Sequence, residues 1–358
     1  MTNVVLLGAG AIGRELLTQI ATAKPSAQRL NICGVIDRSG VAFAPNGLSR
    51  RAVLNLCAAK ASGVGVGESA IGEVASPAEA VDVVTSAALD SAIIVDVTAG
   101  NTHQLLRTAM TRGFDVVLAN KLPIGSSQRQ FDGLRSVARR YGRRIRCEAT
   151  VGAGLPVIDT LQKLRDAGDE IVSIEGCPSG TLGYLFGELE RGSEFSDALR
   201  RAIAAGYTEP DPRIDLSGLD VARKALILGR QIGFRGNPSA IEVESLVPEP
   251  LRERSLTEFL ARAQELDGPM RERTVAANAR GTVLRYRAHV TRESISVGIC
   301  EVARTDPLAS LSGTDNQFAF TTTRYRERKL VITGPGAGTS VTAAGVYNDI
   351  LGLVNSAV

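Results

Sequence analysis

Histidine is scarce in this sequence of 358 residues, which contains only His103 and His289. The two are far apart in the chain, and no cysteine stands at metal-ligand spacing from either. A zinc site or a Ser-His-Asp triad would have to recruit one of them, and packing or surface roles are the expected ones. Proton transfer in an enzyme built on this chain therefore falls to lysine, aspartate, glutamate or tyrosine.

The chain also lacks a dominant charge, a signal peptide and any apolar stretch of membrane-spanning length. The net formal charge is only +3, so no global field attracts nucleic acid. We expect a cytoplasmic protein with a small-molecule partner and with no nucleic-acid or membrane partner. The cysteines are odd in number, never spaced as C-x-x-C, and expected to be separate reduced thiols: Cys33, Cys57, Cys147, Cys177 and Cys300.

A glycine-rich motif follows the first apolar run of the chain. Residues 4–7 lead directly into Gly8-Ala9-Gly10-Ala11-Ile12-Gly13, and a helical pattern covers residues 14–23. In this G-x-G-x-x-G arrangement the first glycine permits a tight turn and the second lets the backbone approach a pyrophosphate. The third glycine lets the helix pack closely on the strand. The sequence therefore predicts dinucleotide binding by the residues Gly8, Gly10, Ala11, Ile12 and Gly13.

A second apolar strand, residues 32–36, ends in Asp37, the position at which an acid would hold the adenosine ribose. Arg38 follows directly and would suit a 2′-phosphate, so NAD and NADP both remain open. The next passage, residues 62–69, is rich in glycine and serine and is expected to be a flexible loop.

Two further buried strands, residues 93–98 and 116–119, end in Thr98 and in Asn120-Lys121. Ligands of open sheets lie beyond the carboxyl ends of the strands, so Thr98 and Lys121 are expected to face the nicotinamide and the substrate. A solvated strand end is the alternative for Lys121. The alternation of strands and helices up to about Cys147 predicts an α/β fold with a doubly wound Rossmann-type nucleotide-binding domain.

Later segments change in character. Residues 243–305 mix helical and alternating patterns, as in the strand-like residues 295–302, which indicates an α+β region. The glycine-rich residues 334–338 precede an alanine-rich amphipathic helix at 339–354, which we expect to return to the first sheet. Residues 148–156 form a second glycine cluster, either a hinge turn or a cage of carbonyl oxygens for a hard cation. Ser179-Gly180-Thr181 opens a helix whose N–H groups suit a carboxylate.

The most informative segment is residues 206–224, with four carboxylates and the lysine Lys224. Its prolines, Pro210 and Pro212, stiffen an extended loop, and a helix begins near Leu219. On that helix Asp220 and Lys224 are four residues apart and share a face. An acidic loop beside a helical lysine indicates a pocket for an amino-acid-sized substrate, and a plain surface ion pair is the alternative.

Together these segments resemble the homoserine dehydrogenase family along nearly the whole chain. The resemblance rests on GAGAIG (8–13), ANKLP (119–123), EATVGAGLP (148–156), SGTLGYLF (179–186), residues 206–224, GTDN (313–316) and GPGAG (334–338). It implies NAD(P)H-dependent, reversible reduction of L-aspartate 4-semialdehyde to L-homoserine. The least familiar stretches are residues 41–77 and 238–291.

By position, the resemblance implies that Lys224 donates the proton, with Lys121 and Asp220 as further catalytic residues. The implied substrate contacts are Glu209, Asp215, Asp220 and Thr181. The implied coenzyme contacts beyond the first motif are Asp37, Arg38, Thr98, Lys121, Gly206 and Gly338. A sodium ion is implied at Glu148, Val151, Ala153 and Leu155.

The resemblance also implies a homodimer with an α+β catalytic and dimerisation region. The expected divisions are 1–147 plus 338–358 for the dinucleotide, 148–160 plus 316–337 for dimerisation and 161–315 for substrate. We expect a monofunctional short form without a kinase segment or a regulatory module, and no threonine feedback through such a module. The rival interpretations are an oxidoreductase acting on a sugar or another amino-acid aldehyde, and a nucleotide-sensing protein without turnover.

Overall fold

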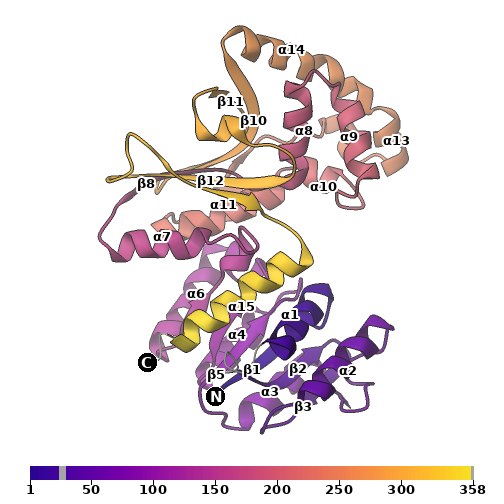
Figure 1. Ribbon diagram of the computed structural model, residues 1–358, viewed down its shortest axis with the longest axis vertical. Coiled ribbons are helices and arrows are strands. Elements are labelled where there is room, and N and C mark those ends of the chain that lie inside the picture. Colours follow the sequence, from indigo (N-terminus) through magenta and orange to yellow (C-terminus); the bar gives the residue numbers. More distant parts are fainter. Residues whose placement is uncertain (24–29, 356–358) are drawn as a thin grey trace. The chain divides into compact units, whose positions relative to one another are not determined.

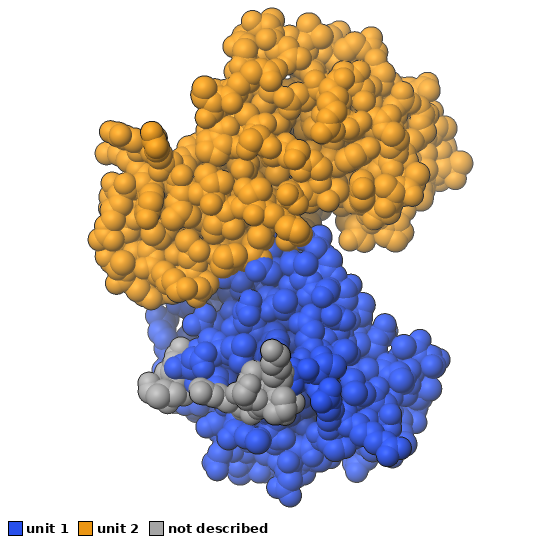
Figure 2. All heavy atoms as spheres, in the orientation of Figure 1, with its two compact units in different colours: residues 1–154, 337–358 blue, residues 155–336 orange. Residues whose placement is uncertain are grey.

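The computed structural model describes residues 1–23 and 30–355, and the chain divides into two compact units (Figures 1 and 2). Unit 1 comprises Met1–Gly154 and Ala337–Val358, and unit 2 comprises Leu155–Gly336. The chain thus leaves unit 1 once and returns to it once. The further division into a separate dimerisation region stays a prediction. Among the described residues, no helix has the length and apolar character needed to cross a membrane.

Unit 1 is built on a seven-stranded sheet with the order β4-β3-β2-β1-β5-β6-β7. The parallel strands are β1 (Thr2–Leu7), β2 (Leu30–Asp37), β5 (Ala92–Asp96), β6 (Asp115–Leu118) and β7 (Ile145–Arg146). Strand β3 (Gly40–Phe43) pairs antiparallel with β2, and the edge strand β4 (Glu73–Val74) pairs antiparallel with β3. Because β2 and β5 lie on opposite sides of β1, the strand order reverses there, which confirms the doubly wound fold.

Helices connect the strands of unit 1. They are α1 (Ala11–Thr22), α2 (Arg50–Ala61), α3 (Pro77–Ser86), α4 (His103–Thr111), α5 (Leu122–Gly125), α6 (Gln128–Arg140), η2 (Glu148–Thr150) and α15 (Thr339–Asn355). The basic run at residues 139–146 ends α6 and continues through a turn into β7.

The last helix, α15, returns to the first sheet as predicted and packs against α1. Its apolar face shares one core cluster with α1, made by Ala343, Val346, Ile350 and Leu353 with Leu16, Leu17 and Ile20. A Cβ on Gly345 would lie 2.2 Å from the carbonyl oxygen of Ala153, so glycine lets the loop after η2 lie directly on α15. Asp349 Oδ2 also accepts the N–H of Glu148 at 2.7 Å.

Unit 2 contains a six-stranded mixed sheet with the order β13-β12-β8-β10-β11-β9. Its strands are β8 (Ile171–Cys177), β9 (Glu242–Val243), β10 (Thr282–Val290), β11 (Ile295–Ala303), β12 (Asp315–Thr322) and β13 (Leu330–Pro335). The pairing is antiparallel except between β9 and β11. The long helices α8 (Gly180–Glu190) and α11 (Leu219–Ile232) contact its central strands, which confirms the predicted α+β region.

The remaining helices of unit 2 surround this frame. They are α7 (Val157–Asp166), α9 (Phe195–Ala204), α10 (Arg213–Leu216), η3 (Pro238–Ala240), α12 (Glu249–Arg252), α13 (Leu256–Ala261), η4 (Ala263–Leu266), α14 (Asp267–Ala279) and η5 (Pro307–Ser310). Phe318 and Phe320 of β12 are completely buried on the apolar side of the sheet. Glu175 lies on β8 between His289 of β10 and Ala319 of β12.

Two expected loops differ from the sequence prediction. Residues 62–69, expected to be flexible, form hydrogen-bonded turns in which Gly67 N donates to Ser39 Oγ at 3.0 Å and Val66 is fully buried. The extended loop expected around Pro212 instead contains helix α10, with Pro212 in a helical conformation at its N-cap. The first N–H groups of a helix have no partner within it, so a proline at the start costs no hydrogen bond. The residues after Pro212 can therefore form a helix.

Candidate functional site

The glycine-rich turn of unit 1 joins β1 to α1. Gly8 has φ of +102°, and its N–H donates to Ile36 O at 2.8 Å. A Cβ on Gly13 would lie 2.0 Å from the oxygen of Gly8, so only glycine lets α1 approach the turn this closely. A Cβ on Gly10, the N-cap of α1, would meet nothing within 4 Å. This open space at a helix N-terminus fits the pyrophosphate of a dinucleotide.

Asp37 ends β2, but its carboxylate is already engaged. Oδ2 accepts hydrogen bonds from Lys60 Nζ at 2.6 Å and from Val66 N at 3.2 Å. Oδ1 accepts from the N–H and the hydroxyl of Ser39 at 2.8 and 2.5 Å. Burial alone would raise the pKa of Asp37, but the bonds from Lys60, Ser39 and Val66 lower it below its usual value. The acid is therefore ionised and paired with a lysine of α2, while Arg38 beside it is exposed.

Asp96 ends β5 and is completely buried among four neutral donors. Oδ1 accepts from the N–H and the hydroxyl of Thr98 at 2.9 and 2.7 Å. Oδ2 accepts from Asn120 Nδ2 at 3.0 Å and from the hydroxyl of Thr102. Burial raises the pKa of Asp96, and these hydrogen bonds oppose that shift. Thr98 is thereby fixed beside the glycine turn, where a Cβ on Gly8 would lie 3.0 Å from its methyl carbon.

Lys121 follows Asn120 at the end of β6 and forms the N-cap of α5. Asn120 Oδ1 accepts the N–H of Leu122 at 3.0 Å, so the side chain before Lys121 holds the backbone after it. Because β5 and β6 are adjacent parallel strands, Thr98 and Lys121 lie at the same, carboxyl edge of the sheet. That arrangement is the one the strand ends predicted.

The other predicted coenzyme contacts are spread over both units. Ala11 and Ile12 begin α1. Gly338 has φ of +112° just before α15, and its carbonyl accepts the N–H of Thr342 at 2.9 Å. Gly206, with φ of +70°, lies after α9 in unit 2, so unit 1 alone does not bring it to the others.

The predicted cation ligands begin in η2, where Glu148 lies, and continue through the turn that follows it. Glu148, Val151 and Ala153 are buried in unit 1, and Leu155 is the first residue of unit 2. Ala153 has φ of +54°, so the chain reverses sharply there. Within residues 1–23 and 30–355, no group of three or more His, Cys, Asp or Glu side chains could hold a metal. A hard cation here would rest on Glu148 and on backbone carbonyl oxygens, and those donors fit such an ion.

In unit 2, the start of α8 and the acidic loop come together at Asp215. Ser179 caps α8 by accepting the N–H of Leu182 at 3.3 Å. The hydroxyl of Thr181 lies 3.1 Å from Asp215 Oδ1, and the N–H of Glu209 donates to Asp215 Oδ2 at 2.8 Å. The predicted substrate contacts Thr181, Glu209 and Asp215 are therefore neighbours.

The acids of this loop differ in their surroundings. Burial raises the pKa of Asp215, and the negative charges of Glu209 and Asp220 raise it further. The fourth acid, Asp211, is instead ion-paired with Arg213 at 2.6 Å, which lowers its pKa. The negative charges gathered around Asp215 favour a cation such as a substrate ammonium group.

Lys224 stands on α11 with only 9% of its surface exposed. Its Nζ donates to the carbonyl oxygen of Pro178 at 2.7 Å and lies 3.0 Å from Asp220 Oδ2. Pro178 directly precedes the cap of α8, so the ammonium group is held at the start of that helix. The burial speaks against the alternative of a plain surface ion pair, since exposed pairs of this spacing stay in solvent.

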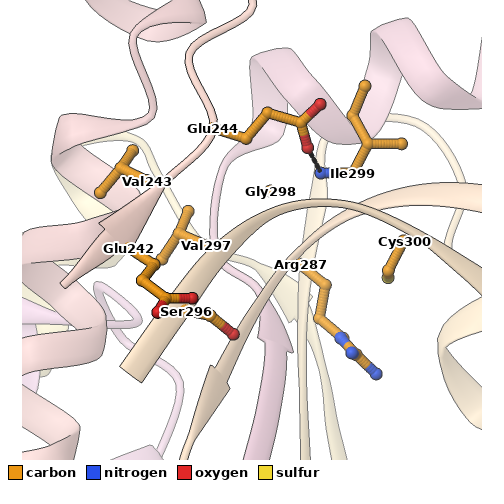
Figure 3. Close-up of a pocket in the computed structure, with 9 residues that line it drawn as sticks. All are labelled: Glu242, Val243, Glu244, Arg287, Ser296, Val297, Gly298, Ile299 and Cys300. Carbon is orange, nitrogen blue, oxygen red and sulfur yellow. Dashed lines mark hydrogen bonds between the residues drawn. The ribbon is translucent and has the colours of Figure 1, made fainter. Parts of the chain in front are cut away.

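A hollow of about 400 Å³ also lies on the sheet of unit 2 (Figure 3). It is lined at the β9–β11 edge by Glu242, Glu244, Arg287, Ser296 and Cys300, among others. None of the predicted site residues lines it. Glu244 is also committed elsewhere, because it accepts from Ile299 N at 2.8 Å and from Arg273 at 2.6 Å.

Comparison with known proteins identifies both units. The family model described as homoserine dehydrogenase matches residues 156–351, and the model for its NAD-binding domain matches residues 8–148. A bifunctional aspartokinase/homoserine dehydrogenase from Daucus carota is 46% identical over 75% of this chain, which spans 29% of that longer protein. Homoserine dehydrogenase of Schizosaccharomyces pombe is 38% identical over 74% of this chain and 73% of its own. A hyperthermophilic archaeal homoserine dehydrogenase, solved in complex with NADPH, is 26% identical over 99% of this chain and 98% of its own, with a TM-score of 0.75.

The glycine-rich turn of unit 1 and these matches define a protein with a Rossmann-type NAD-binding domain joined to a second, catalytic-family unit. Within that class the assignment is specific, because the catalytic family model alone covers more than half of the 358 residues. The chain belongs to the homoserine dehydrogenase family.

Several residues around these sites carried no signal in the sequence. Lys60 is 23 positions from Asp37, and no local pattern pairs them. Pro178 contributes only its backbone carbonyl to Lys224. Asp96 and Asn120 did have a local signal, because each polar residue ends a buried apolar strand, where a side chain must find partners.

Proposed function

We propose that this protein catalyses the reversible NAD(P)H-dependent reduction of L-aspartate 4-semialdehyde to L-homoserine. The coenzyme, when bound, supplies the hydride that reaches the aldehyde carbon. The carbonyl oxygen then carries negative charge and needs a proton as it forms. The observation that carries the proposal is the buried ammonium group of Lys224, held beside Asp220 and next to the acidic loop.

Lys224 donates that proton in the direction of reduction and recovers it in the reverse direction. Asp220 orients the lysine through its 3.0 Å contact. Glu209 and Asp215 bind the substrate ammonium group, with Thr181 holding Asp215 in place. Lys121, at the carboxyl edge of unit 1, is the second cationic group for the substrate. A sugar lacks an ammonium group, so these carboxylates favour an amino-bearing aldehyde.

The test is coenzyme oxidation with L-aspartate 4-semialdehyde, in wild type and in Lys224→Ala. We expect kcat to fall by about 10²–10⁴-fold in the variant, with coenzyme affinity retained. Lys163→Ala is the matched control, because Lys163 pairs with Asp159 at the same i,i+4 spacing in the same unit but is 75% exposed. The control should keep wild-type kcat. Near-native turnover by Lys224→Ala would remove Lys224 from the reaction.

For the coenzyme we propose a preference for NADPH. An acid selects NAD by accepting hydrogen bonds from the ribose hydroxyls, and both oxygens of Asp37 are already occupied. Lys60 neutralises its charge, and Arg38 adds an exposed cation at the same strand end. Asp37, Lys60 and Arg38 together carry a net positive charge, which favours a 2′-phosphate. The archaeal relative solved with NADPH is in keeping with this preference.

We also propose a sodium ion at the turn of Glu148, Val151, Ala153 and Leu155. Its support is the buried carboxylate of Glu148 close to a reversing chain, where a carboxylate and backbone carbonyls would supply the hard oxygen donors that such an ion takes. A stabilising shift of the melting temperature by sodium, absent with choline and lost in Glu148→Gln, would support the site, and equal melting temperatures in both salts would exclude it.

A further inference from the structure

We infer that Asp96 and Asn120 are positioning residues, whose side chains set the location of Thr98 and Lys121 at the carboxyl edge of unit 1. The inference rests on the proposed function, which places Thr98 at the coenzyme and Lys121 at the substrate. Neither Asp96 nor Asn120 needs to touch a ligand in this role. They act through Thr98, which lies two positions after Asp96, and through Lys121, which directly follows Asn120.

Asn120 connects the two loops at this edge. Its Nδ2 lies 2.8 Å from Gly100 O, 3.0 Å from Asp96 Oδ2 and 3.1 Å from Thr98 Oγ1. Its Oδ1 accepts the N–H of Leu122. The amide is 3% exposed, so water does not replace these bonds when one is lost. One side chain therefore ties the loop after β5 to the turn that carries Lys121.

Asp96 requires a carboxylate and not merely its shape. All four of its hydrogen-bond partners donate: two groups of Thr98, the hydroxyl of Thr102 and the amide of Asn120. An asparagine at this position would turn an NH₂ group toward at least one of these donors. A buried donor facing a donor loses its bond and pushes the neighbouring group away.

The groups that would be displaced are Thr98 and Lys121, which the proposed function assigns to the coenzyme and the substrate. Thr98 is held at both its N–H and its hydroxyl by one oxygen of Asp96, and it packs against Gly8 of the phosphate-binding turn. Lys121 is flanked by Asn120 and by the Leu122 N–H that Asn120 accepts. A misplacement of about 1 Å at a reacting group can cost about 10²-fold in rate.

The experiment compares Asp96→Asn with Asp115→Asn. Asp115 is also a buried aspartate of this sheet, bonded to Arg144 N at 2.7 Å, but it begins β6 and so lies at the opposite, amino edge. Both variants should lose thermal stability. Only Asp96→Asn should raise the Kd for NADPH, by about tenfold, and lower kcat by about 10–100-fold. If Asp96→Asn fails to fold, Asn120→Ala takes its place, since it leaves the Thr98 and Thr102 bonds to Asp96 intact.

A double-mutant cycle separates positioning from general damage. If Asp96 acts through Lys121, the loss in kcat of Asp96→Asn should largely vanish when Lys121→Ala is already present. Losses that multiply would overturn that part of the inference. A folded Asp96→Asn with wild-type Kd and kcat, or a loss equal to that of Asp115→Asn, would overturn it entirely.

Failure of the proposed function has a different signature. If Lys121→Ala keeps full turnover, or if wild type has no turnover, the assigned role of Lys121 is wrong. The NADPH Kd of Asp96→Asn against Asp115→Asn still decides whether Asp96 positions Thr98, because that titration needs no substrate. A tenfold difference supports the inference in that case, and equal Kd values refute it.

Discussion

The coenzyme preference expected from Asp37 depends on a side chain that lies far from it in the sequence. In the sequence it stands where an acid selects NAD, and the neighbouring Arg38 left the choice open. In the structure Lys60 of α2 reaches the carboxylate at 2.6 Å, with side-chain exposures of only 19% and 13% for the pair. The net charge of Asp37, Lys60 and Arg38 at this strand end is therefore positive.

Replacing Lys60 by methionine should shift the coenzyme preference toward NADH. The freed carboxylate of Asp37 would accept the ribose hydroxyls and repel a 2′-phosphate. We expect the ratio of kcat/KM for NADPH to kcat/KM for NADH to fall by about tenfold or more, because an unpaired carboxylate would replace an ion pair beside the 2′-phosphate. Steady-state kinetics with both coenzymes measures it.

The control for that change is Arg51→Met, which removes an exposed cation from the same helix without touching Asp37. Its coenzyme ratio should stay at the wild-type value. An unchanged ratio in Lys60→Met, or a wild type that already prefers NADH, would contradict the interpretation of Asp37.

At this scale the sequence predicted residues whose signal is local. Thr98 and Lys121 follow strand ends, and Asp220 stands one turn from Lys224, so their positions could be worked out. The partners Lys60 and Pro178 could not, because a contact between distant segments depends on how the elements pack and leaves no periodic trace.

Among the elements, helix α11 has the most constrained start. Its N-cap, Gly218, has φ of +72°, and a Cβ there would lie 1.9 Å from the hydroxyl oxygen of Tyr286. That hydroxyl donates to Glu244 O at 2.6 Å, so it cannot move away from an added Cβ without losing this hydrogen bond. The first turn of α11 carries Asp220, and the next turn carries Lys224.

Gly218→Ala should therefore displace the start of α11 and lower both stability and activity. We expect a loss of about 1–3 kcal/mol in the free energy of unfolding from the clash and the left-handed backbone. We also expect kcat to fall by about tenfold or more as Asp220 moves. Chemical denaturation and steady-state kinetics measure the two effects.

The matched control is Gly192→Ala in the same unit, because Gly192 has φ of +87° but its Cβ would meet nothing within 4 Å. It isolates the backbone strain and should keep wild-type kcat. Adding Tyr286→Phe to Gly218→Ala should recover part of the activity by removing the atom that clashes. Equal behaviour of the two glycine variants would refute a role for Tyr286 in placing the helix.

The elements themselves were largely predictable where periodicity is strong. Helices α8, α11 and α15 and strand β11 appear where caps, spacing and alternation indicated them. Helix α10 was missed because two prolines suggested only a loop, although proline is compatible with a helix that starts just after it. The order of the turns at residues 62–69 has no local signal, because it comes from Asp37 and Ser39, which lie elsewhere in the chain.

For the whole molecule, the sheet of unit 2 bears on the predicted homodimer. In β13 the side chains alternate between half-buried and exposed, with Val331, Thr333 and Pro335 exposed. On β8, interactions with His289, Lys329 and Arg287 hold the pKa of Glu175 at about 2 despite its burial. We propose that β13, which lies in the region 316–337, contributes to the interface of a homodimer.

Thr333→Arg should convert the dimer to a monomer, because a new charge on each copy would meet its symmetry-related neighbour across a two-fold interface. Light scattering over a range of concentrations measures the molar mass. Val275→Arg, at a 62% exposed apolar position on α14, should leave the dimer intact. A wild-type protein of monomeric mass, or a dimeric Thr333→Arg, would contradict the proposed interface.

The return of α15 to unit 1 has a consequence for synthesis on the ribosome. The strands of the dinucleotide sheet emerge first, but the helix that covers Leu16, Leu17 and Ile20 is translated only after all of unit 2. At about 5–20 residues per second, the intervening residues 155–336 take roughly 10–35 s to make. During that interval the nascent first unit exposes an apolar stripe that chaperones can bind, and unit 2 can fold before unit 1 is complete.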